Sequence, residues 1–254
     1  MSDISICIPT YEFKGDGVKY LSELLDTLRT QTFKNFDVVI SDHSRDDEIM
    51  NYCESVSDEF DFTYAKNPNG RGNLGPNTNC ALELAEGTIC KIQYQDDLFV
   101  DDEALQKIYD AYDKNDCKWT FNGFCHTKDG KKFFKHKVPV WEDCMLQGRN
   151  LLGNPSGMSV LNECKMYMNE KINLLVDTEL YHRMRVAYGL PFIIEDTLTS
   201  TREHENRTSS SRIHYNATIE HPKGNWRINK EELDYIITEL HPDYYQDYKY
   251  PDEA

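Results

Sequence analysis

Two adjacent carboxylates, Asp96 and Asp97, follow a short apolar run that is typical of a buried strand. Side-by-side carboxylates repel each other unless a cation or basic group compensates them, and hard divalent metals prefer such oxygen ligands. The pair therefore indicates a metal-assisted site for a phosphate-bearing ligand. For an Asp-Asp pair taken alone, a solvated acidic loop is the alternative.

Polar residues also follow the ends of three other predicted strands. Thr10 and Tyr11 follow the first, Asp42 the second, and a glycine-rich loop at 70–75 the third. In open α/β sheets, ligands bind outside the carboxyl ends of the parallel strands. We therefore expect these residues and the Asp pair to converge at one edge of a sheet.

The spacing of apolar residues predicts the elements that position these side chains. Strands are expected at 5–8, 36–40, 62–65 and 89–94, alternating with helices at 18–30, 46–56, 77–85 and from a cap at Asp101 to 112. Later come a hairpin (119–126 and 132–136), a helix (178–187), a strand (193–194) and a final helix (230–240). Alternating strands and helices predict an α/β fold with a largely parallel sheet.

Composition bounds the class of protein. The chain has 254 residues and a net charge of −16, which argues against nucleic-acid and anionic-membrane partners, since both require a basic face. No apolar run approaches transmembrane length and no signal-peptide pattern opens the chain. Eight scattered cysteines without a close Cys-x-x-Cys pair favour reduced thiols and a cytoplasmic location. Five lysines at 128–137 form either a solvated hairpin or a contact for an anionic substrate.

The loop Gly70-Arg-Gly-Asn-Leu-Gly75 matches the dinucleotide fingerprint G-x-G-x-x-G, with Asp96 about 20 residues further on. Three features weaken this interpretation. Asn67-Pro68-Asn69 separates the strand from the glycines, Pro76 stands where the helix is expected to run, and the loop follows the third strand. A flexible loop and a direct substrate contact are the other interpretations. The P-loop, G-x-S-x-G and H-E-x-x-H motifs do not occur.

In order and spacing, the motifs together resemble glycosyltransferase family 2, the inverting nucleotide-sugar transferases of the GT-A fold. The matching text is ISICIPTY at 4–11, VVISDHSRD at 38–46, NLGPNTN at 73–79, LAEG at 84–87, QYQDD at 93–97, GNPS at 153–156, VDTEL at 176–180 and TREH at 201–204. The resemblance covers residue 4 to about 210. It implies a GT-A, Rossmann-like α/β sheet flanked by helices, with irregular C-terminal additions.

The resemblance also implies roles for individual residues. Asp177 matches the general base, with Glu179 beside it, and Asp97 would bind Mn²⁺ or Mg²⁺ together with His204. The donor nucleotide-sugar, expected to be a UDP-sugar, would contact the remaining residues: Pro9, Thr10, Tyr11, Asp42 (the base), Asn73 and Asp96 (the ribose or sugar). The acceptor would be a hydroxyl of a glycan, a lipid-linked molecule or a protein.

Two positions depart from the family pattern. Tyr94 stands where the family usually has the first carboxylate of its metal motif, and Thr78 replaces a common arginine. The Gln-x-x-Arg-Trp signature of processive relatives does not occur, so we expect transfer of a single sugar. Tyr94 keeps a non-catalytic nucleotide-sugar-binding protein as one alternative. An NAD(P)-dependent oxidoreductase that uses the Gly70–Gly75 loop is the other.

Local structural roles compete with several of these functional ones. Asp177 is well placed to be a helix N-cap, His204 to be a solvated loop residue, and Asp42 to close an Asx-turn. For the domain organisation, we expect one GT-A domain over 1–215. Residues 216–254 would then add a C-terminal helix and an acidic tail to it.

Overall fold

The computed structural model describes residues 2–143, 145, 149–204, 218–220 and 227–241. The strands are β1 Ile4–Thr10, β2 Phe36–Asp42, β3 Phe62–Lys66, β4 Ile89–Ile92, β5 Leu98–Phe99, β6 Trp119–Thr127, β7 Phe133–Lys137, β8 Met158–Leu161, β9 Phe192–Arg202, β10 Thr218–Glu220 and β11 Arg227–Asn229. The α-helices are α1 Gly17–Arg29, α2 Glu48–Ser55, α3 Leu74–Leu84, α4 Ala104–Lys114, α5 Val176–Tyr188 and α7 Lys230–Tyr235, which continues as a π-helix over Ile236–Leu240. Short 3₁₀ turns include Pro155–Gly157.

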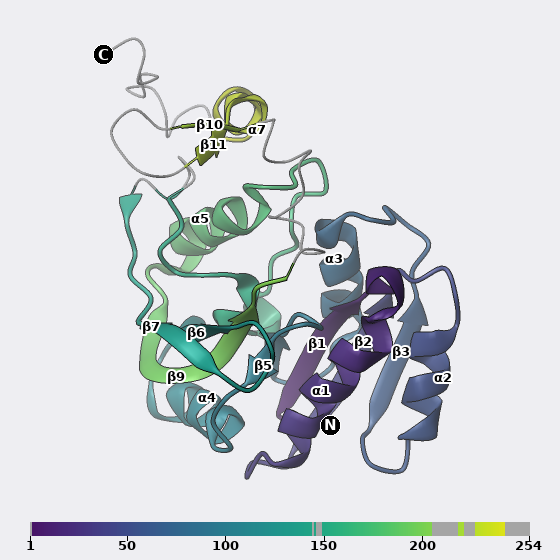
Figure 1. The fold of residues 1–254 in the computed structure, drawn as a ribbon. Helices are drawn as coiled ribbons and strands as arrows, with labels where there is room; N and C mark the ends of the chain where they lie inside the picture. The colour runs from purple at the N-terminus through teal and green to yellow at the C-terminus, as the bar shows by residue number, and fades with distance from the viewer. Residues whose placement is uncertain (1, 144, 146–148, 205–217, 221–226, 242–254) are drawn as a thin grey trace.

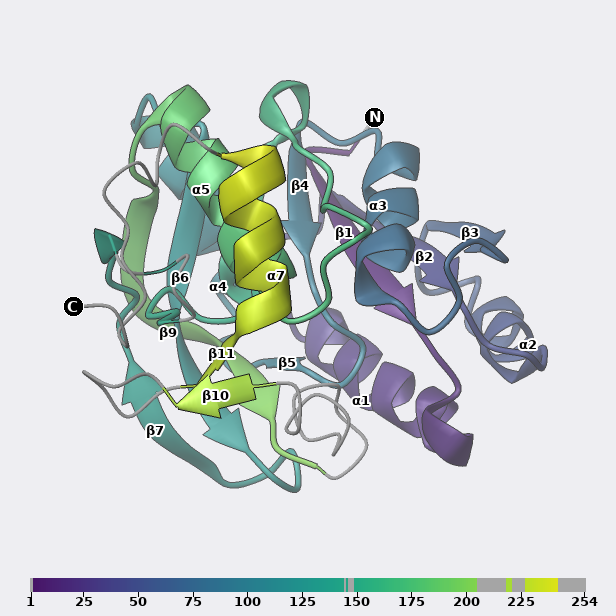
Figure 2. The same ribbon diagram turned by 90° about the horizontal axis from the view of Figure 1, so that it is seen from above.

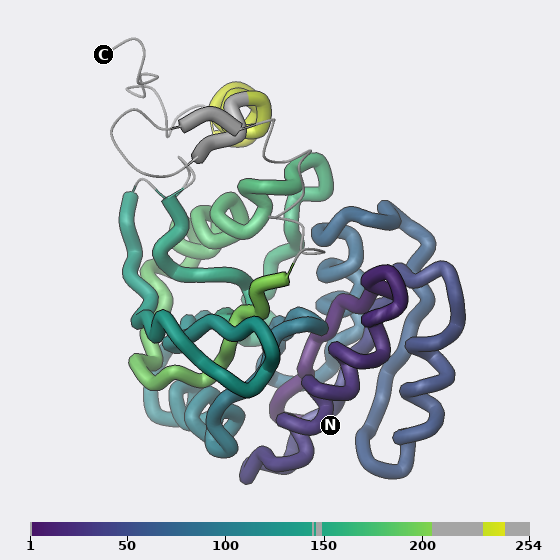
Figure 3. Tube along the Cα trace, viewed as in Figure 1, coloured from purple at the N-terminus to yellow at the C-terminus, as the bar shows by residue number. Residues whose placement is uncertain are grey.

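One large mixed sheet organises the molecule, with strand order β3-β2-β1-β4-β8-β6-β9-β5 and β7 paired to β6 (Figure 1). The first four strands in this order are parallel to one another. Beyond β4, strand β8 runs antiparallel to both of its neighbours, while β6 and β9 are parallel. The N-terminal half, purple to blue in Figure 3, lies beside the teal and green second half.

Helices cover both faces of the sheet because its strands bury side chains on both sides. One core packs Ile4, Ile6 and Ile8 of β1 against the leucines of α1, together with residues of α2 and α4. The opposite core contains Cys7 of β1, residues of α3 and α5, and two residues of the C-terminal segment. The apolar spacing in α1 places Leu21, Leu24, Leu25 and Leu28 on one buried stripe. This two-sided burial explains the continuous apolar runs of the parallel strands.

The predicted elements of the first half are all present, with shifted ends. Helix α3 begins at Leu74 rather than at residue 77, since Pro76 lies in the first turn, where a missing N–H costs no intrahelical bond. Strand β4 ends at Ile92 rather than at residue 94, because the backbone N–H of Tyr94 bonds to the Ser156 side chain. The cap predicted at Asp101 is wrong: Glu103, two positions later, is the N-cap of α4, and the Asp101 carboxylate accepts the Glu103 N–H at 2.8 Å.

The second half differs more from the prediction. The short strand expected at 193–194 is part of the eleven-residue strand β9, which ends at Arg202 and pairs with β6 through irregular register shifts. Strand β5 follows the Asp pair and was not predicted. The expected acidic tail and most of the loop after His204 lie outside the described residues. None of the helices in the described part of the chain is long and apolar enough for a membrane crossing.

Candidate active site

The ends of the parallel strands are fastened together at the edge where the sequence places its polar residues. Asn77 of α3 donates to the Thr10 carbonyl at 2.9 Å and accepts from the Ser41 hydroxyl at 2.6 Å, which ties β1 to β2. Gln95 accepts the Tyr11 N–H at 2.7 Å and donates to the Gly17 carbonyl at 2.6 Å. The predicted convergence of strand ends is therefore present, and buried amide side chains maintain it.

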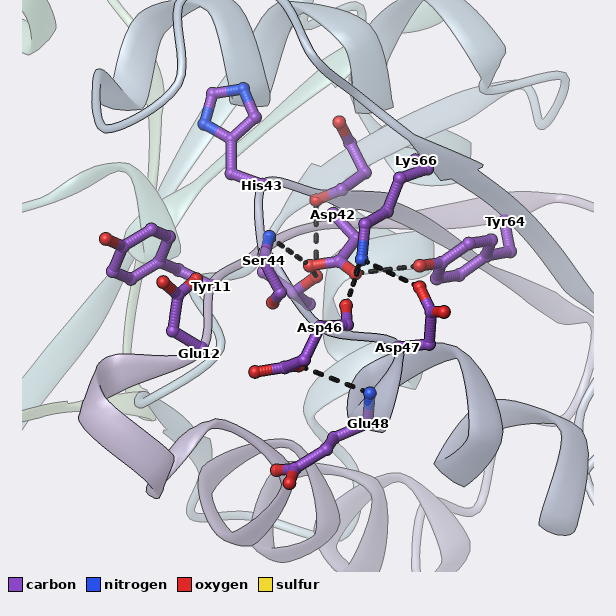
Figure 4. Close-up of polar contacts among 12 residues, drawn as sticks. Tyr11, Glu12, Asp42, His43, Ser44, Asp46, Asp47, Glu48, Tyr64 and Lys66 are labelled. Atoms are coloured by element: carbon purple, nitrogen blue, oxygen red, sulfur yellow. Dashed lines mark hydrogen bonds and ion pairs between the residues drawn. The ribbon is translucent and has the colours of Figure 1, made fainter.

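Asp42, at the end of β2, is fully buried and surrounded by protein donors (Figure 4). Its carboxylate accepts from the Ser44 N–H at 2.8 Å, the Tyr64 hydroxyl at 2.7 Å, the Lys66 ammonium at 3.1 Å and the Thr10 hydroxyl at 3.2 Å. Burial opposes its ionisation, but the hydrogen bonds from Ser44, Tyr64 and Lys66 outweigh burial and lower the pKa of Asp42. The Asx-turn interpretation is thus confirmed by the Ser44 contact, while base recognition by Asp42 stays a prediction.

The glycine-rich loop runs from β3 into α3 with two residues in the left-handed region. Gly70 has φ +63° and Gly72 has φ +90°, conformations that side chains disfavour. Between them Arg71 donates to the His43 carbonyl at 2.7 Å and to the Glu12 carboxylate at 2.6 Å, and its guanidinium lies over the Tyr11 ring. Asn73, predicted to contact the donor, is exposed at the N-cap of α3.

Asp97 is buried, and both of its carboxylate oxygens already accept hydrogen bonds from the protein. Its Oδ2 accepts from the Asn154 amide and the Ser156 hydroxyl, each at 2.6 Å, and its Oδ1 accepts the Arg202 N–H at 2.9 Å. Burial and the neighbouring Asp96 raise the pKa of Asp97 to about 7, against the opposing effect of these hydrogen bonds. Asp97 therefore joins three segments: the turn after β4, the Pro155–Gly157 turn and the end of β9.

The structure brings His204 to Asp96, not to Asp97 as the sequence assignment expects. His204 Nε2 lies 2.8 Å from Asp96 Oδ2, and both side chains retain some exposure. The His204 ring packs edge-on against Phe13 and lies against Tyr20, so it is not a freely solvated loop residue. Arg202 donates hydrogen bonds to the Asp96 backbone carbonyl and to the Glu23 carboxylate, which fixes the backbone that carries the pair.

The donor set at this edge suits a divalent cation only in part. Within the described residues, no group of three or more His, Cys, Asp or Glu side chains is arranged to hold a metal. Mg²⁺ and Mn²⁺, however, are commonly held by one or two protein ligands, with the substrate phosphates and water completing the shell. Asp96 and His204 carry ligand atoms of suitable chemistry, and Asp96 Oδ2 and His204 Nε2 bond to each other at 2.8 Å. The residues present therefore fit a cation that arrives with a diphosphate and replaces this contact.

Asp177 lies in the first turn of α5, two residues after the N-cap Leu175. The interpretation of Asp177 as the N-cap is therefore wrong. Its Oδ1 accepts the Thr178 N–H at 2.8 Å, and its Oδ2 accepts the Asn150 amide at 3.1 Å. Burial raises the pKa of Asp177 to about 6, although these two hydrogen bonds oppose the shift. A partly exposed carboxylate with this pKa is ionised at neutral pH and is basic enough to take a proton.

Glu179, the neighbouring carboxylate, has a different environment. It is buried and bonded to Arg183 at 2.7 Å and 2.8 Å and to His241 at 3.1 Å. Burial opposes its ionisation, but the bonds from His241 and Arg183 lower the pKa of Glu179. A carboxylate that is already paired with the Arg183 guanidinium and bonded to His241 is a structural ion-pair residue rather than a base.

The sequence of the chain matches the family described as "Glycosyl transferase family 2" over residues 5–174, which is more than half of the chain. The chain belongs to glycosyltransferase family 2. An uncharacterized glycosyltransferase of Rickettsia prowazekii is 27% identical over 96 residues, which make up 38% of this chain and 28% of that relative.

Solved structures give the same fold. TarS of S. aureus (residues 1–349) in complex with UDP-GlcNAc matches with a TM-score of 0.64 and 18% identity, over 82% of this chain and 61% of that one. The mannosyltransferase PcManGT of Pyrobaculum calidifontis in complex with GDP-Man and Mn²⁺ matches with a TM-score of 0.57 and 16% identity, over 84% and 61%. The family 2 chain thus has the predicted GT-A fold and spans less than two thirds of these neighbours.

Tyr94 occupies the place of the first family carboxylate. Its hydroxyl is buried. Burial raises the pKa of Tyr94 well above its ordinary value, and the Asp177 carboxylate raises it further. This family 2 chain therefore places a protonated phenol in the electrostatic field of Asp177, at the position where the resemblance leads us to expect a carboxylate.

The lysine-rich hairpin of β6 and β7 borders a hollow of about 380 Å³ beside the site. Its lining is Lys128, Asp129, Lys132, Phe134, Lys135 and Glu203. Lys135 forms an ion pair of 3.3 Å with Glu203, the residue before His204. The hairpin is confirmed, and contact with an anionic substrate stays a prediction.

Several functional residues of this family 2 chain were not assigned a role from sequence. Three of them, Asn154, Ser156 and Arg202, lie in motifs that the resemblance includes. Each donates a hydrogen bond to the Asp97 carboxylate, so these motifs hold Asp97 in place. Asn150 and Lys91 carry no local signal. Lys91 is fully buried in β4, where it donates to the Ile92 carbonyl at 2.9 Å and to the Ser156 carbonyl.

Proposed function

We propose that this chain transfers one sugar, with inversion, from a nucleoside-diphosphate donor to a hydroxyl acceptor. The observation that carries the proposal is the segment 150–156, which contacts both the candidate base Asp177 and the buried Asp97 beside the proposed cation ligands. At one end Asn150 bonds to Asp177, and at the other Asn154 and Ser156 bond to Asp97. A candidate base and a candidate donor site are thus held by one short stretch of chain.

In the proposed reaction the Asp177 carboxylate takes the proton of the acceptor hydroxyl as its oxygen attacks the anomeric carbon. The bond between that carbon and the diphosphate oxygen breaks on the opposite face, so the anomeric configuration inverts. Asn150 and the Thr178 N–H hold the carboxylate in a fixed orientation. The direct displacement needs no covalent intermediate with the protein.

We assign the cation ligands to Asp96 and His204 and give Asp97 a supporting role. A divalent ion bound there would supply positive charge to the departing diphosphate. The assignment rests on accessibility, because Asp97 is buried and accepts three hydrogen bonds while Asp96 and His204 retain exposure. Mn²⁺ is favoured by the ion that accompanies GDP-Man in the PcManGT structure.

For the donor we propose a UDP-sugar, bound near Pro9, Thr10, Tyr11, Asp42 and Asn73. Neighbours were solved with UDP, UDP-GlcNAc and GDP-Man. A carboxylate that accepts a hydrogen bond from the nucleobase, as Asp42 is proposed to do, favours bases with a ring N–H. Uracil, thymine and guanine have this group, and adenine lacks it at that position. We further propose that residues 1–215 form the catalytic domain and that 216–254 are appended to it. The acceptor class remains a glycan, a lipid-linked molecule or a protein.

A direct test measures donor binding and turnover together. UDP, GDP, TDP and ADP are titrated calorimetrically with Mn²⁺ and with EDTA, and nucleotide-sugars are then screened for release of nucleoside diphosphate. We expect Mn²⁺-dependent binding of UDP that is tighter than that of ADP, followed by turnover of one UDP-sugar with an acceptor. Tighter binding of ADP would contradict the donor assignment, and binding of NAD(P)H in place of UDP would favour the oxidoreductase alternative.

Tyr94 supports one competing function, that of a nucleotide-sugar-binding protein without turnover. The missing carboxylate weakens the cation site, and the buried, neutral hydroxyl of Tyr94 adds no charge to replace it. Metal-dependent binding with no turnover of any donor, across glycan, lipid-linked and protein acceptors, would favour this function over catalysis.

A further inference from the structure

A carboxylate from the C-terminal helix binds the backbone at the start of the helix that carries Asp177. Glu232 of α7 accepts the N–H of Asn173 at 2.9 Å, of Leu174 at 2.9 Å and 3.2 Å, and of Leu175 at 2.9 Å. Leu175 is the N-cap residue of α5, and Asp177 follows two positions later. One side chain therefore fixes the three residues that lead into the catalytic turn.

The local sequence explains why this contact stabilises the helix start. A helix N-terminus exposes N–H groups and carries partial positive charge, which Ser, Thr, Asp or Asn at the N-cap normally satisfies. Here the N-cap is Leu175, which has no side-chain acceptor. Glu232, 57 positions after Leu175, accepts the N–H of this N-cap residue and of the two residues before it, and it places a negative charge at the positive end of the helix.

Further contacts hold the same C-terminal segment on α5, and Figures 1 and 2 both show α7 next to that helix. Leu233 and Ile236 are fully buried in the core that also contains Leu180 of α5. At the far end of the segment His241 bonds to Glu179 at 3.1 Å. The segment is thus packed by apolar burial and oriented by two charged contacts.

We infer that residues 231–241 form a docking arm that sets the position of Asp177, with Glu232 as its positioning residue. The family match ends at residue 174, within the bonded stretch 173–175, so residues 231–241 lie outside the matched region. The inference rests on the proposed role of Asp177 as the base. It adds a dependence of that base on a segment far along the chain.

The charge of Glu232 also acts on Asp177 through space. Burial is the main cause that raises the pKa of Asp177 to about 6, and the Glu232 carboxylate raises it further. Among the described residues, Tyr94 and Tyr181 also interact with Asp177, and their pKa values are raised well above the ordinary range. Both are neutral in the acid range, whereas removal of the Glu232 carboxylate changes the field at Asp177 there. Loss of its charge should lower the pKa of Asp177.

The test compares Glu232→Gln with Glu239→Gln in the full-length chain. Glu239 is exposed on the same segment and forms no hydrogen bond or ion pair within the described residues, so its substitution removes the same charge without the contact. For Glu232→Gln we expect kcat to fall by about ten- to hundredfold, the scale of a misplaced reacting group, with little change in donor KM. The acid limb of the pH–kcat profile should move to lower pH. Glu239→Gln should match the unmodified protein in kcat, in donor KM and in the acid limb of the profile.

Amide hydrogen exchange at 173–175 separates failure of this inference from failure of the proposed function. Glu232→Gln should accelerate exchange there whether or not a donor and acceptor are known, while Glu239→Gln should not. Unchanged exchange in Glu232→Gln would overturn the docking arm itself. If Glu232→Gln exchanges faster but keeps the kcat and the acid limb of the pH–kcat profile of the unmodified protein, the positioning role would be overturned. If the unmodified protein turns over no donor, the proposed function fails, and the exchange result still decides whether the arm is real.

Discussion

At the scale of single residues, two carboxylates of the candidate site differ in pKa because their surroundings differ. Asp177 and Glu179 are two positions apart on α5, yet burial raises the pKa of the first while Arg183 and His241 lower that of the second. Proximity in sequence suggested both as bases. The partners that separate them come from other segments, which local sequence does not reveal.

The first residue-scale prediction concerns Asp177→Asn. Asparagine can keep an acceptor oxygen for the Thr178 N–H but cannot take a proton, so transfer should fall by about 10²–10⁴-fold while melting and donor affinity stay near normal. The measurement is turnover of the identified donor and acceptor beside a melting curve and a donor titration. Turnover close to the unmodified rate would remove Asp177 from the mechanism.

The second residue-scale prediction separates Asp96 from Asp97. Asp96→Asn should abolish most of the Mn²⁺-dependent part of UDP affinity with little loss of stability. Asp97→Asn places an amide N–H₂ among three buried donors, so it should destabilise the protein by about 1–3 kcal/mol for each unmet group. Calorimetric titration with Mn²⁺ or EDTA and urea unfolding distinguish the two. If Asp97→Asn loses the Mn²⁺ dependence of UDP binding without losing stability, Asp97 and not Asp96 would be the metal ligand.

At the scale of elements, apolar spacing was enough to predict the parallel strands and their helices, because burial on each face of the sheet repeats along the chain. Element ends were harder to predict because contacts distant in sequence set them. Strand β4 stops where Ser156 captures the Tyr94 N–H, and Arg202 belongs to β9 because that strand continues along β6. Neither partner is near in sequence.

The element-scale prediction concerns the turn at Pro155–Gly157. Ser156 donates to Asp97 at 2.6 Å and accepts the Tyr94 N–H at 3.0 Å, so Ser156→Ala leaves both groups short of a partner. We expect a loss of about 1–3 kcal/mol in the free energy of unfolding. Ser57→Ala, at an exposed serine, should change it by less than about 0.5 kcal/mol. Similar stabilities for the two variants in urea would show that the turn does not support Asp97.

At the scale of the molecule, the order of motifs predicted the GT-A fold, since strand ends that carry polar residues must meet at one edge of a parallel sheet. The mixed half of the sheet, with the short strand β5 and the antiparallel β8, has no comparable periodic signal. The attachment of α7 to α5 depends on Glu232 and on residues about 57 positions earlier. Pairings over such separations are set by the assembled core and are not visible in local patterns.

The prediction at this scale is that the stability of the whole chain depends on pH through Lys91. Burial lowers the pKa of Lys91 from 10.5 to about 7, although the Asp97 carboxylate opposes this shift. Below pH 7 the folded protein therefore bears the cost of a buried ammonium. Between about pH 7 and 10.5 the unfolded chain binds the extra proton, so the contribution of Lys91 to stability becomes more favourable as the pH rises.

Lys91→Met removes this titration. Its free energy of unfolding minus that of the unmodified protein should be most positive near pH 6.5 and should fall towards pH 9.5, by up to about 1.4 kcal/mol per pH unit. The carbonyls of Ile92 and Ser156 lose a donor in this variant, but that loss does not depend on pH and shifts the difference by a constant. Urea unfolding at three pH values measures the slope, and Lys131→Met, at an exposed lysine, is the matched control with no expected slope. A difference that stays constant with pH in Lys91→Met would mean that the buried amine stays protonated in the folded protein across this range, and would contradict the lowered pKa of Lys91.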